Sequence, residues 1–147
     1  MKGFTFRLDR ILRLREDAEQ RQARAYGQAA RTETEAERAC SEQQSYLREI
    51  GDRIAPPPGQ TTNAGLLQVL NLTASAAAQQ LDEAERHRDE ARQTADTERD
   101  RLAQARVERK SLERLKGHQQ AAWKEESGRA EQKDIDEIAA RTRKPMP

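Results

Sequence analysis

Cysteine, aromatic residues and long apolar runs are all scarce in this 147-residue chain. The single cysteine, Cys40, excludes an internal disulfide and agrees with a reducing compartment. No apolar run approaches the roughly 18 to 20 residues that cross a bilayer. Nor does Met1-Lys2-Gly3-Phe4 lead into the apolar stretch of a secretory signal. We therefore expect a cytoplasmic protein.

The charge balance excludes a second class of protein. A net charge of +1 lacks the basic surplus that phosphate binding needs, so we expect no nucleic-acid partner. With 34% hydrophobic and 3% aromatic residues, the chain has too few apolar side chains to form a thick globular core. Proline and glycine are also sparse, which argues against disorder. Abundant Ala, Glu, Gln and Arg with a helical period instead indicate long helices that pack along a thin seam.

The motifs of common catalytic and cofactor sites are missing. There is no phosphate-binding GxxxxGK[ST], no GxGxxG, no HExxH and no cysteine pair with metal spacing. Carboxylates alternate with arginines at helical spacing, which is typical of solvated ion-pair faces. His87 and His118 lie too far apart to share a metal, and Cys40 is predicted to be a small apolar filler. We expect no enzyme, no cofactor, no metal and no small-molecule substrate.

Two segments carry a heptad pattern, with apolar residues alternating at steps of three and four. The pattern predicts an all-α fold, a long antiparallel two-helix coiled coil that forms one domain over residues 1–147. Helix one is expected at about 5–54, a proline-rich bend at 55–63 and helix two at about 64–142. The predicted seam of helix one is Leu8, Ile11, Arg15, Ala18, Gln22, Ala25, Ala29, Thr32, Ala36, Ala39, Gln43, Tyr46 and Ile50. That of helix two is Leu67, Leu70, Ala74, Ala77, Leu81, Ala84, Arg88, Ala91, Ala95, Glu98, Leu102, Ala105, Arg109 and Leu112.

The break between the helices is Pro56-Pro57-Pro58-Gly59, where prolines remove backbone donors and glycine permits a turn. Thr61, Thr62 or Asn63 is expected to cap helix two. So short a connection makes the helices antiparallel neighbours. One register pairs Ile50 with Leu70, Ala39 with Leu81, Ala29 with Ala91, Ala18 with Leu102, Leu8 with Leu112 and Ile11 with Arg109. A shift by one heptad keeps the pattern, so the register stays open.

The two helices differ in length, and this predicts a free end. In the register above, the start of helix one lies opposite Leu112, whereas the helical pattern of helix two continues to about Thr142. Trp123 then has no core to join and is expected to contact a partner, because tryptophan is enriched at interface hot spots.

The apolar residues near the bend allow two interpretations. Tyr46, Leu47, Ile50 and Ile54 are expected to face Leu66, Leu67, Val69, Leu70 and Leu72. They either clamp the bend or, because the second set covers too wide an arc for one seam, leave part of it exposed as a docking patch.

The ends of the chain resemble the FliJ family of flagellar export proteins. The opening stretch that carries the resemblance is Phe4-x-Phe6-Arg7-Leu8-x-Arg10-Ile11-Leu12-x-Leu14-Arg15. The closing stretches are Lys110-x-Leu112-Glu113-x-Leu115-Lys116 and Arg129-x-Glu131-Gln132-Lys133-x-x-Asp136-Glu137-Ile138-Ala139. Together they cover about a third of the chain, and the rest is similar only in its coiled-coil character and length.

The resemblance implies a soluble, non-enzymatic component of the flagellar type III export apparatus, associated peripherally with the inner face of the cell membrane. Its partners would be the export ATPase ring, the cytoplasmic domain of the membrane export gate, and export chaperones. The resemblance assigns the ATPase contact to Phe4, Phe6, Arg7, Leu8, Ile11, Arg129, Gln132, Asp136 and Ile138, to which we add Trp123. It assigns the gate contact to Tyr46, Ile50, Leu70, Ala74 and Ala77. The alternatives are a self-associating structural coiled coil and the equivalent stalk protein of a virulence secretion system.

Overall fold

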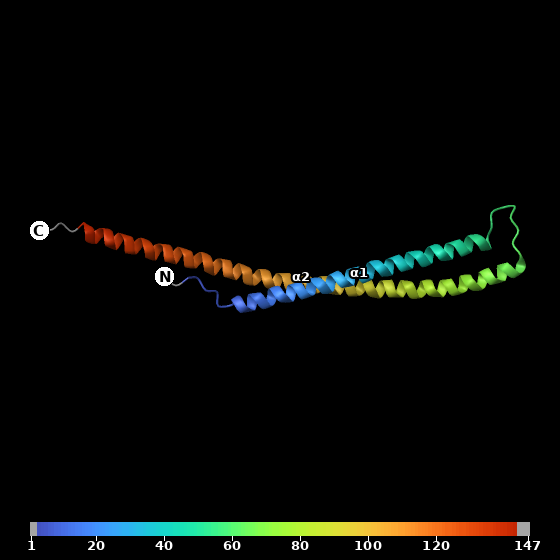
Figure 1. Cartoon of the computed structure of the whole chain (residues 1–147), viewed down its shortest axis with the longest axis horizontal. Helices are drawn as coiled ribbons and strands as arrows, with labels where there is room; N and C mark the ends of the chain where they lie inside the picture. Colours follow the sequence, from blue (N-terminus) through green and yellow to red (C-terminus); the bar gives the residue numbers. More distant parts are fainter. Residues whose placement is uncertain (1–2, 144–147) are drawn as a thin grey trace. The chain divides into compact units, whose positions relative to one another are not determined.

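Two long helices make up almost all of the computed structural model, which describes residues 3–143 (Figure 1). Helix α1 runs from Asp9 to Ile54 and helix α2 from Ala64 to Thr142, and the described residues contain no strand. The two helices pack against each other in antiparallel fashion, which confirms the predicted all-α helical hairpin. Contacts divide the chain into two compact units, each treated separately below. One comprises the residues up to Gln20 and those from Gln104 onward, and the other comprises Arg21–Ala103. Whether residues 1–147 act as one domain stays a prediction.

The connection between the helices has the chemistry that its sequence predicts. The amide of Gln60 donates to the carbonyl of Pro57 over 3.2 Å, which closes a turn around Pro58 and Gly59. Gly59 takes a φ of 98°, a left-handed conformation that glycine adopts without steric cost. Asn63 then caps α2, because its side-chain oxygen accepts the backbone N–H of Gly65 at 2.8 Å. Of the three residues predicted to cap α2, Asn63 is the one that does so.

Helix α1 begins at Asp9, later than the predicted start near residue 5. The segment before it, residues 3–8, is irregular and ends in a turn in which the amide of Asp9 donates to the carbonyl of Phe6. Phe6 is buried, although it lies outside the helix. Phe6 is therefore buried as part of an irregular segment. The predicted turn of helix before Asp9 does not form.

The seam of α2 is confirmed along its whole predicted length, since none of its positions from Leu67 to Leu112 is exposed. The predicted seam of α1 is confirmed in part. Gln22, Ala29, Ala36, Gln43 and Ile50 are buried or half-buried as predicted.

The alternate positions of the α1 seam are shifted by one residue. The structure turns Leu12, Tyr26, Cys40 and Leu47 inward, where the prediction had Ile11, Ala25, Ala39 and Tyr46. Ala18 and Thr32 are half-buried as predicted, together with their neighbours Glu19 and Glu33, whereas Arg15 is exposed and does not belong to the seam. Cys40 is buried and Ala39 exposed, so the cysteine is itself a seam residue. At two of these positions the shift buries the more apolar side chain, because Cys40 replaces the small Ala39 and Leu47 replaces Tyr46, whose hydroxyl stays in water.

Within the unit Arg21–Ala103, apolar packing is thickest near the bend. Ile50, Leu70 and Ala77 form a buried cluster, with Leu47, Ile54 and Ala74 packed against it. The predicted pairing of Ile50 with Leu70 is therefore confirmed, and the clamp interpretation holds for these residues. Elsewhere the buried residues of this unit include Leu102 and Cys40, but most are alanines, whose small side chains contribute little to stability: Ala29, Ala36, Ala91 and Ala95.

Polar groups also lie in this seam. The amide of Gln22 donates to the carboxylate of Glu98 and, at 3.2 Å, to its backbone carbonyl. The guanidinium of Arg88 lies 3.5 Å from the sulfur of Cys40 and also binds Asp89. Such directional contacts favour one register of the two helices, which a row of alanines does not.

Candidate functional site

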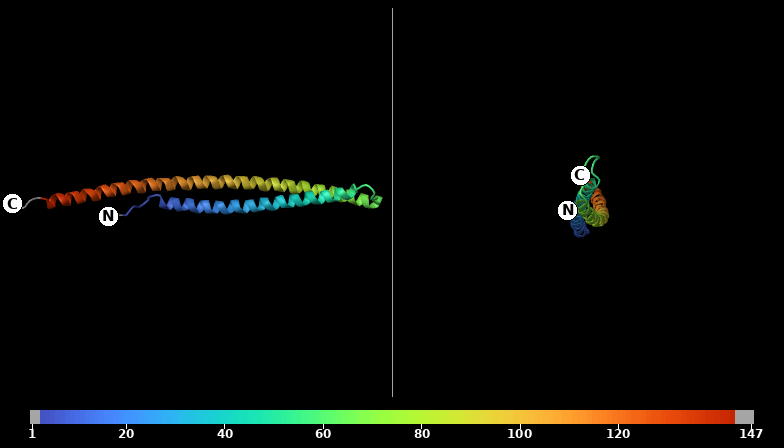
Figure 2. Two further views of the ribbon diagram at one scale, coloured as in Figure 1. Left: turned by 90° about the horizontal axis from the view of Figure 1, so that it is seen from above. Right: turned by 90° about the vertical axis from the view of Figure 1, so that its right-hand side faces the viewer.

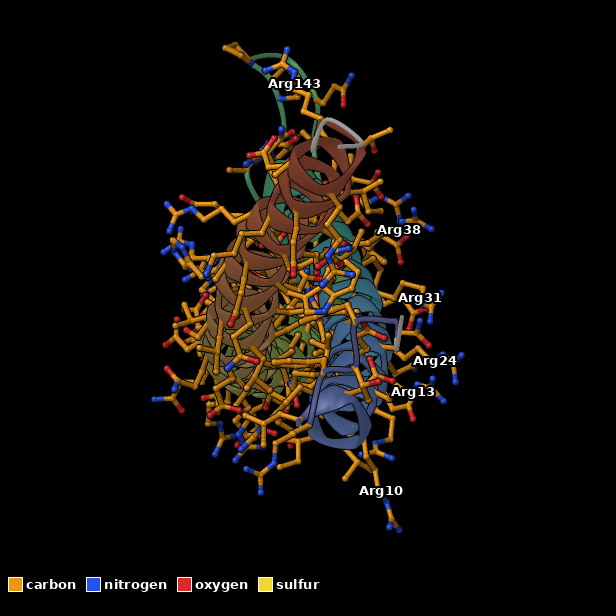
Figure 3. All side chains as sticks on the ribbon, turned by 90° about the vertical axis from the view of Figure 1, so that its left-hand side faces the viewer. Arg10, Arg13, Arg24, Arg31, Arg38 and Arg143 are labelled. Carbon is orange, nitrogen blue, oxygen red and sulfur yellow. The ribbon has the colours of Figure 1, made fainter. Side chains whose placement is uncertain are left out.

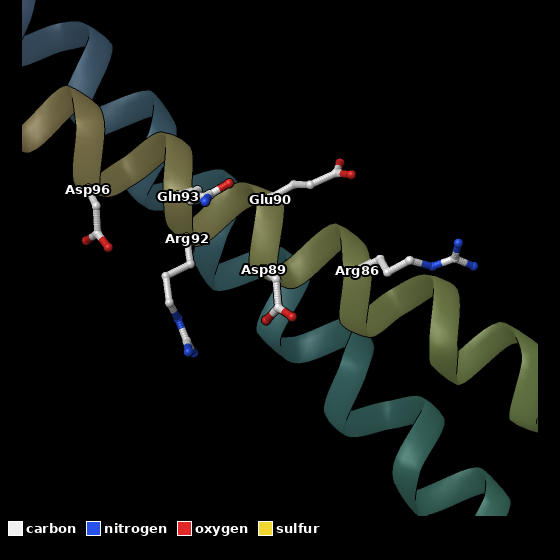
Figure 4. A pocket seen from close by; sticks show the side chains of 6 residues that line it. All are labelled: Arg86, Asp89, Glu90, Arg92, Gln93 and Asp96. Atoms are coloured by element: carbon white, nitrogen blue, oxygen red, sulfur yellow. The ribbon is translucent and has the colours of Figure 1, made fainter.

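The hollows of the structure do not form a reaction site. In the one drawn in Figure 4, all six lining side chains, Arg86, Asp89, Glu90, Arg92, Gln93 and Asp96, come from α2 and extend from its surface. Arg92 makes ion pairs with Glu33 and Glu37 of α1, at 3.7 and 3.3 Å. Among residues 3–143, no group of three or more metal-ligating side chains is placed to share an ion. The candidate functional residues are therefore described below by their exposure and contacts on the surface of each unit.

No helix within residues 3–143 combines the length and the apolar character that a membrane crossing requires.

The irregular N-terminal segment, residues 3–8, packs on α2. The rings of Phe4 and Trp123 lie 6.1 Å apart between centroids and are tilted by 49°. The ammonium of Lys116 lies 5.9 Å from the centroid of the buried Phe6 ring, within reach of a cation–π interaction. Trp123 is therefore half-buried against its own chain. The prediction that Trp123 has no internal partner is wrong.

Ion pairs fasten the start of α1 to α2 in the same unit. Lys116 binds Asp9 at 3.1 Å, and Arg15 binds Glu108. The hydrogen bond from Lys116 holds the pKa of the Asp9 carboxyl below its usual value. Together with the aromatic contacts, these pairs hold the N-terminal end of the chain on α2 between Gln104 and Trp123.

Arg109 takes a different role from the one predicted for it. Its guanidinium binds Glu19 and Glu113, and the hydrogen bond to Glu19 raises the pKa of the Arg109 guanidinium above its ordinary value. Ile11 is 42% exposed. The predicted layer of Ile11 on Arg109 is therefore wrong, because the one-residue shift of the seam replaces Ile11 by Leu12.

Beyond Ser127, the end of α2 is exposed on all sides. Every described residue from Gly128 onward is exposed, including Ile135 at 58% and Ile138 at 65%. In Figures 1 and 2 this stretch, orange to red, has no α1 ribbon beside it. Pairs within the helix, Arg129 with Glu125 and Arg141 with Glu137, stabilise it locally. We call residues 128–142 the α2 tail. It begins later than the predicted overhang, because residues 3–8 cover α2 as far as Trp123.

The residues predicted to contact an ATPase fall into two groups in this unit. Phe4, Phe6, Leu8 and Trp123 are buried or half-buried, and Phe4 and Trp123 are brought together. Arg7, Ile11, Arg129, Gln132, Asp136 and Ile138 are exposed. Gln132 and Asp136 are joined by a hydrogen bond of 2.9 Å on the tail. The predicted ATPase contact omitted Leu14 and Ile135, two large apolar residues that are exposed. The signal in the sequence was that neither residue belongs to a predicted seam.

The residues predicted to contact a gate lie near the bend, in the other unit. Ile50, Leu70 and Ala77 are core residues, Ala74 packs against them, and Tyr46 is exposed. Three further apolar residues, Leu66, Val69 and Leu72, are also exposed on this part of α2. The wide apolar arc thus divides into a buried clamp and an exposed remainder, and the use of that remainder as a docking patch stays a prediction.

The Phe4–Trp123 contact is open to a direct test. We expect a double-mutant cycle of Phe4→Ala and Trp123→Ala to give a coupling free energy of about 0.5 to 1.5 kcal/mol, the range typical of aromatic pairs. The measurement is the free energy of unfolding from denaturant titration of the four proteins. As a control, Phe4→Ala combined with Leu72→Ala should be additive, since the exposed Leu72 belongs to the other unit and sites that share no partner act independently. Additivity of the Phe4 and Trp123 changes would contradict the contact.

Comparison with known proteins gives one match. A family model described as "Flagellar FliJ protein" matches residues 4–144, nearly the whole chain. Comparisons with curated proteins and with solved structures found no match.

Proposed function

The chain belongs to the FliJ family of flagellar proteins, and on this premise we propose that it is a non-enzymatic, stalk-like component of the flagellar type III export apparatus. In this role it binds the export ATPase and promotes assembly of the ATPase ring. The family places the chain among proteins related to flagellar export; the partners are the proposal. The match over residues 4–144 favours the flagellar system over the equivalent virulence system.

The observation that carries the proposal is the α2 tail. A helix of about 20 Å, at 1.5 Å per residue, continues past the last contact of its own chain with Ile135 and Ile138 uncovered. Arg129, Glu137 and Arg141 are paired with residues one turn away, and Asp136 accepts a hydrogen bond from Gln132. Exposed apolar residues on such a helix are typical of a segment that docks into a groove of another protein.

The N-terminal segment supports the same assignment. Phe4 contacts Trp123, and Phe6 lies against Lys116, so these contacts hold residues 4–6 on α2 before the tail begins. Arg7 and Ile11 stay exposed there. We therefore propose that the ATPase contacts the tail together with the exposed part of the N-terminal stretch. Phe4, Phe6, Leu8 and Trp123 position that surface.

We assign the gate contact to the exposed residues near the bend. Tyr46, Leu66, Val69 and Leu72 supply the accessible apolar surface, while Ile50, Leu70, Ala74 and Ala77 hold the two helices together beneath it. Escort of export chaperones and a position at the inner face of the cell membrane belong to the same proposal, and they rest on family membership alone.

The experiment is to add the full chain to the cognate export ATPase and to measure ATP hydrolysis and ring formation together. The proposal predicts a rise in both that saturates with added chain. Hydrolysis and ring assembly that stay at their basal level at all ratios would contradict it. Ring assembly is scored by sedimentation, so that a change in activity is tied to a change in mass.

A further inference from the structure

The start of α1 carries an exposed face that is both apolar and basic. Ile11 is 42% exposed and Leu14 is 57% exposed. Arg10 precedes them by less than one turn, and Arg7 lies in the turn before the helix. Neither arginine makes an ion pair with any residue in the part of the chain that the structure describes. Arg10 extends away from the helices in Figure 3. We call Arg7, Arg10, Ile11 and Leu14 the basic face.

The α2 tail carries a face that is apolar and acidic. Ile135 and Ile138 are exposed, and Glu131 and Asp134 each precede one of them by one helical turn. Within residues 3–143, these two carboxylates have no ion-pair partner, whereas Glu125 and Glu137 are bound by arginines of the same helix. We call Glu131, Asp134, Ile135 and Ile138 the acidic face.

The two faces have the same spacing. Each consists of two like charges three residues apart, followed by two large apolar residues at the fourth and seventh positions after the first charge. Residues at i, i+3, i+4 and i+7 share one side of a helix, which applies to all four residues of the acidic face and, on α1, to Arg10, Ile11 and Leu14. A parallel alignment brings Arg10 opposite Asp134, Ile11 opposite Ile135 and Leu14 opposite Ile138, and Arg7, in the turn before α1, comes next in the series toward Glu131. Both the charges and the apolar residues are then complementary.

The two faces cannot meet within one molecule of this structure. The N-terminal segment contacts α2 at Lys116 and Trp123, and the tail continues beyond that point with every described residue exposed. We propose that the chain associates with a second copy of itself, the acidic face of each tail lying on the basic face of the other molecule. The contact occurs twice about a two-fold axis, as is usual for protein dimers. This goes beyond the proposed function, because it requires no component of the export apparatus.

The chemistry of the contact sets its strength and its salt dependence. Each of the two contacts pairs exposed charges, which contribute little individually, around a small apolar centre. The Debye length falls from about 8 Å at 0.15 M salt to about 3 Å at 1 M salt, so the charged part is screened at high salt. We therefore expect a weak, concentration-dependent dimer that dissociates as salt is added.

Sedimentation of the full chain over a roughly hundredfold range of concentration tests the association. We expect the average mass to rise from monomer toward dimer at low salt and to return toward monomer at high salt. A chain that stays monomeric throughout would overturn the proposal, and the basic face would then be left for an acidic segment of another protein.

Charge reversal tests which residues form the contact. The double variant Arg7→Glu with Arg10→Glu and the double variant Glu131→Lys with Asp134→Lys should each lose self-association, because like charges would then face each other. Mixed in equal amounts, the two variants should associate again, since each reversed face meets a complementary one in the other chain. All four positions are exposed, so circular dichroism should report unchanged helix content.

The matched control changes the same charge on another part of α1. Arg24→Glu with Arg31→Glu removes two exposed arginines that extend outward from α1 (Figure 3) and should leave association intact. Loss of association in this control, or full association in both face variants, would overturn the assignment. Failure of the mixed variants to associate would do the same.

Discussion

Replacing Ile50 with alanine lowers the free energy of unfolding by about 2 to 4 kcal/mol. Large-to-small changes in a core lose the transfer free energy of the deleted atoms and leave a cavity whose lining loses contacts. Ile50 is 4% exposed and belongs to the cluster with Leu70 and Ala77, where most of the large apolar side chains of its unit gather. The alanine-rich remainder of the seam has little to compensate for the loss.

The control is Leu72→Ala, a change of the same kind on the same stretch of the hairpin. Leu72 is 67% exposed, so its truncation should alter the free energy of unfolding by less than about 0.5 kcal/mol. Denaturant titration followed by circular dichroism measures both proteins. Equal losses for the two variants would mean that the division into clamp and exposed remainder is wrong.

Replacing Ile135 and Ile138 together with aspartate abolishes stimulation of the export ATPase and leaves the fold intact. Truncating a hot-spot residue costs about 2 kcal/mol or more, which is about thirtyfold in affinity, and a charge on an apolar contact costs more than truncation. Both isoleucines are exposed in the free chain, so their loss removes no internal contact of the described structure. The measurement is ATP hydrolysis as a function of added chain, alongside the melting temperature.

A matched double change on the other unit separates a local effect from a general one. Val69→Asp with Leu72→Asp places the same two charges on exposed apolar positions near the bend. This variant should stimulate the ATPase as the unaltered chain does, because the proposed ATPase surface lies on the tail. If the tail variant still stimulates the ATPase fully, or if both variants lose stimulation equally, the tail is not the ATPase contact.

Most of the fold was predictable because leucines mark the seam of α2. Leu67, Leu70, Leu81, Leu102 and Leu112 all fall on one heptad series, and large apolar side chains fix which face is buried. In α1 the predicted seam and the observed one share Ala29, Ala36 and Ile50. They differ where the prediction takes Ala39 and Tyr46 and the structure buries Cys40 and Leu47. Small and amphipathic residues discriminate poorly between neighbouring positions, so the prediction slipped by one residue.

The position of the N-terminal segment was not predictable from periodicity. Residues 3–8 are irregular, and an irregular segment carries no repeating signal from which a contact with α2 is read. The aromatic residues Phe4 and Trp123 were the available clue, since aromatic side chains bury a large area and form favourable pairs. That contact moved the start of the free helix from near Leu112 to beyond Ser127.

The α2 tail is exposed among residues 3–143, and we propose that it gains a partner from the ATPase. Amide hydrogen exchange of the full chain, alone and with the cognate ATPase, tests this most directly, because exchange reports local opening of helices. We expect the amides of residues 129–142 to exchange faster in the free chain than those around Leu102, and to become protected when the ATPase is added. Protection of the tail already in the free, monomeric chain, or a tail that stays equally fast with the ATPase bound, would contradict the account.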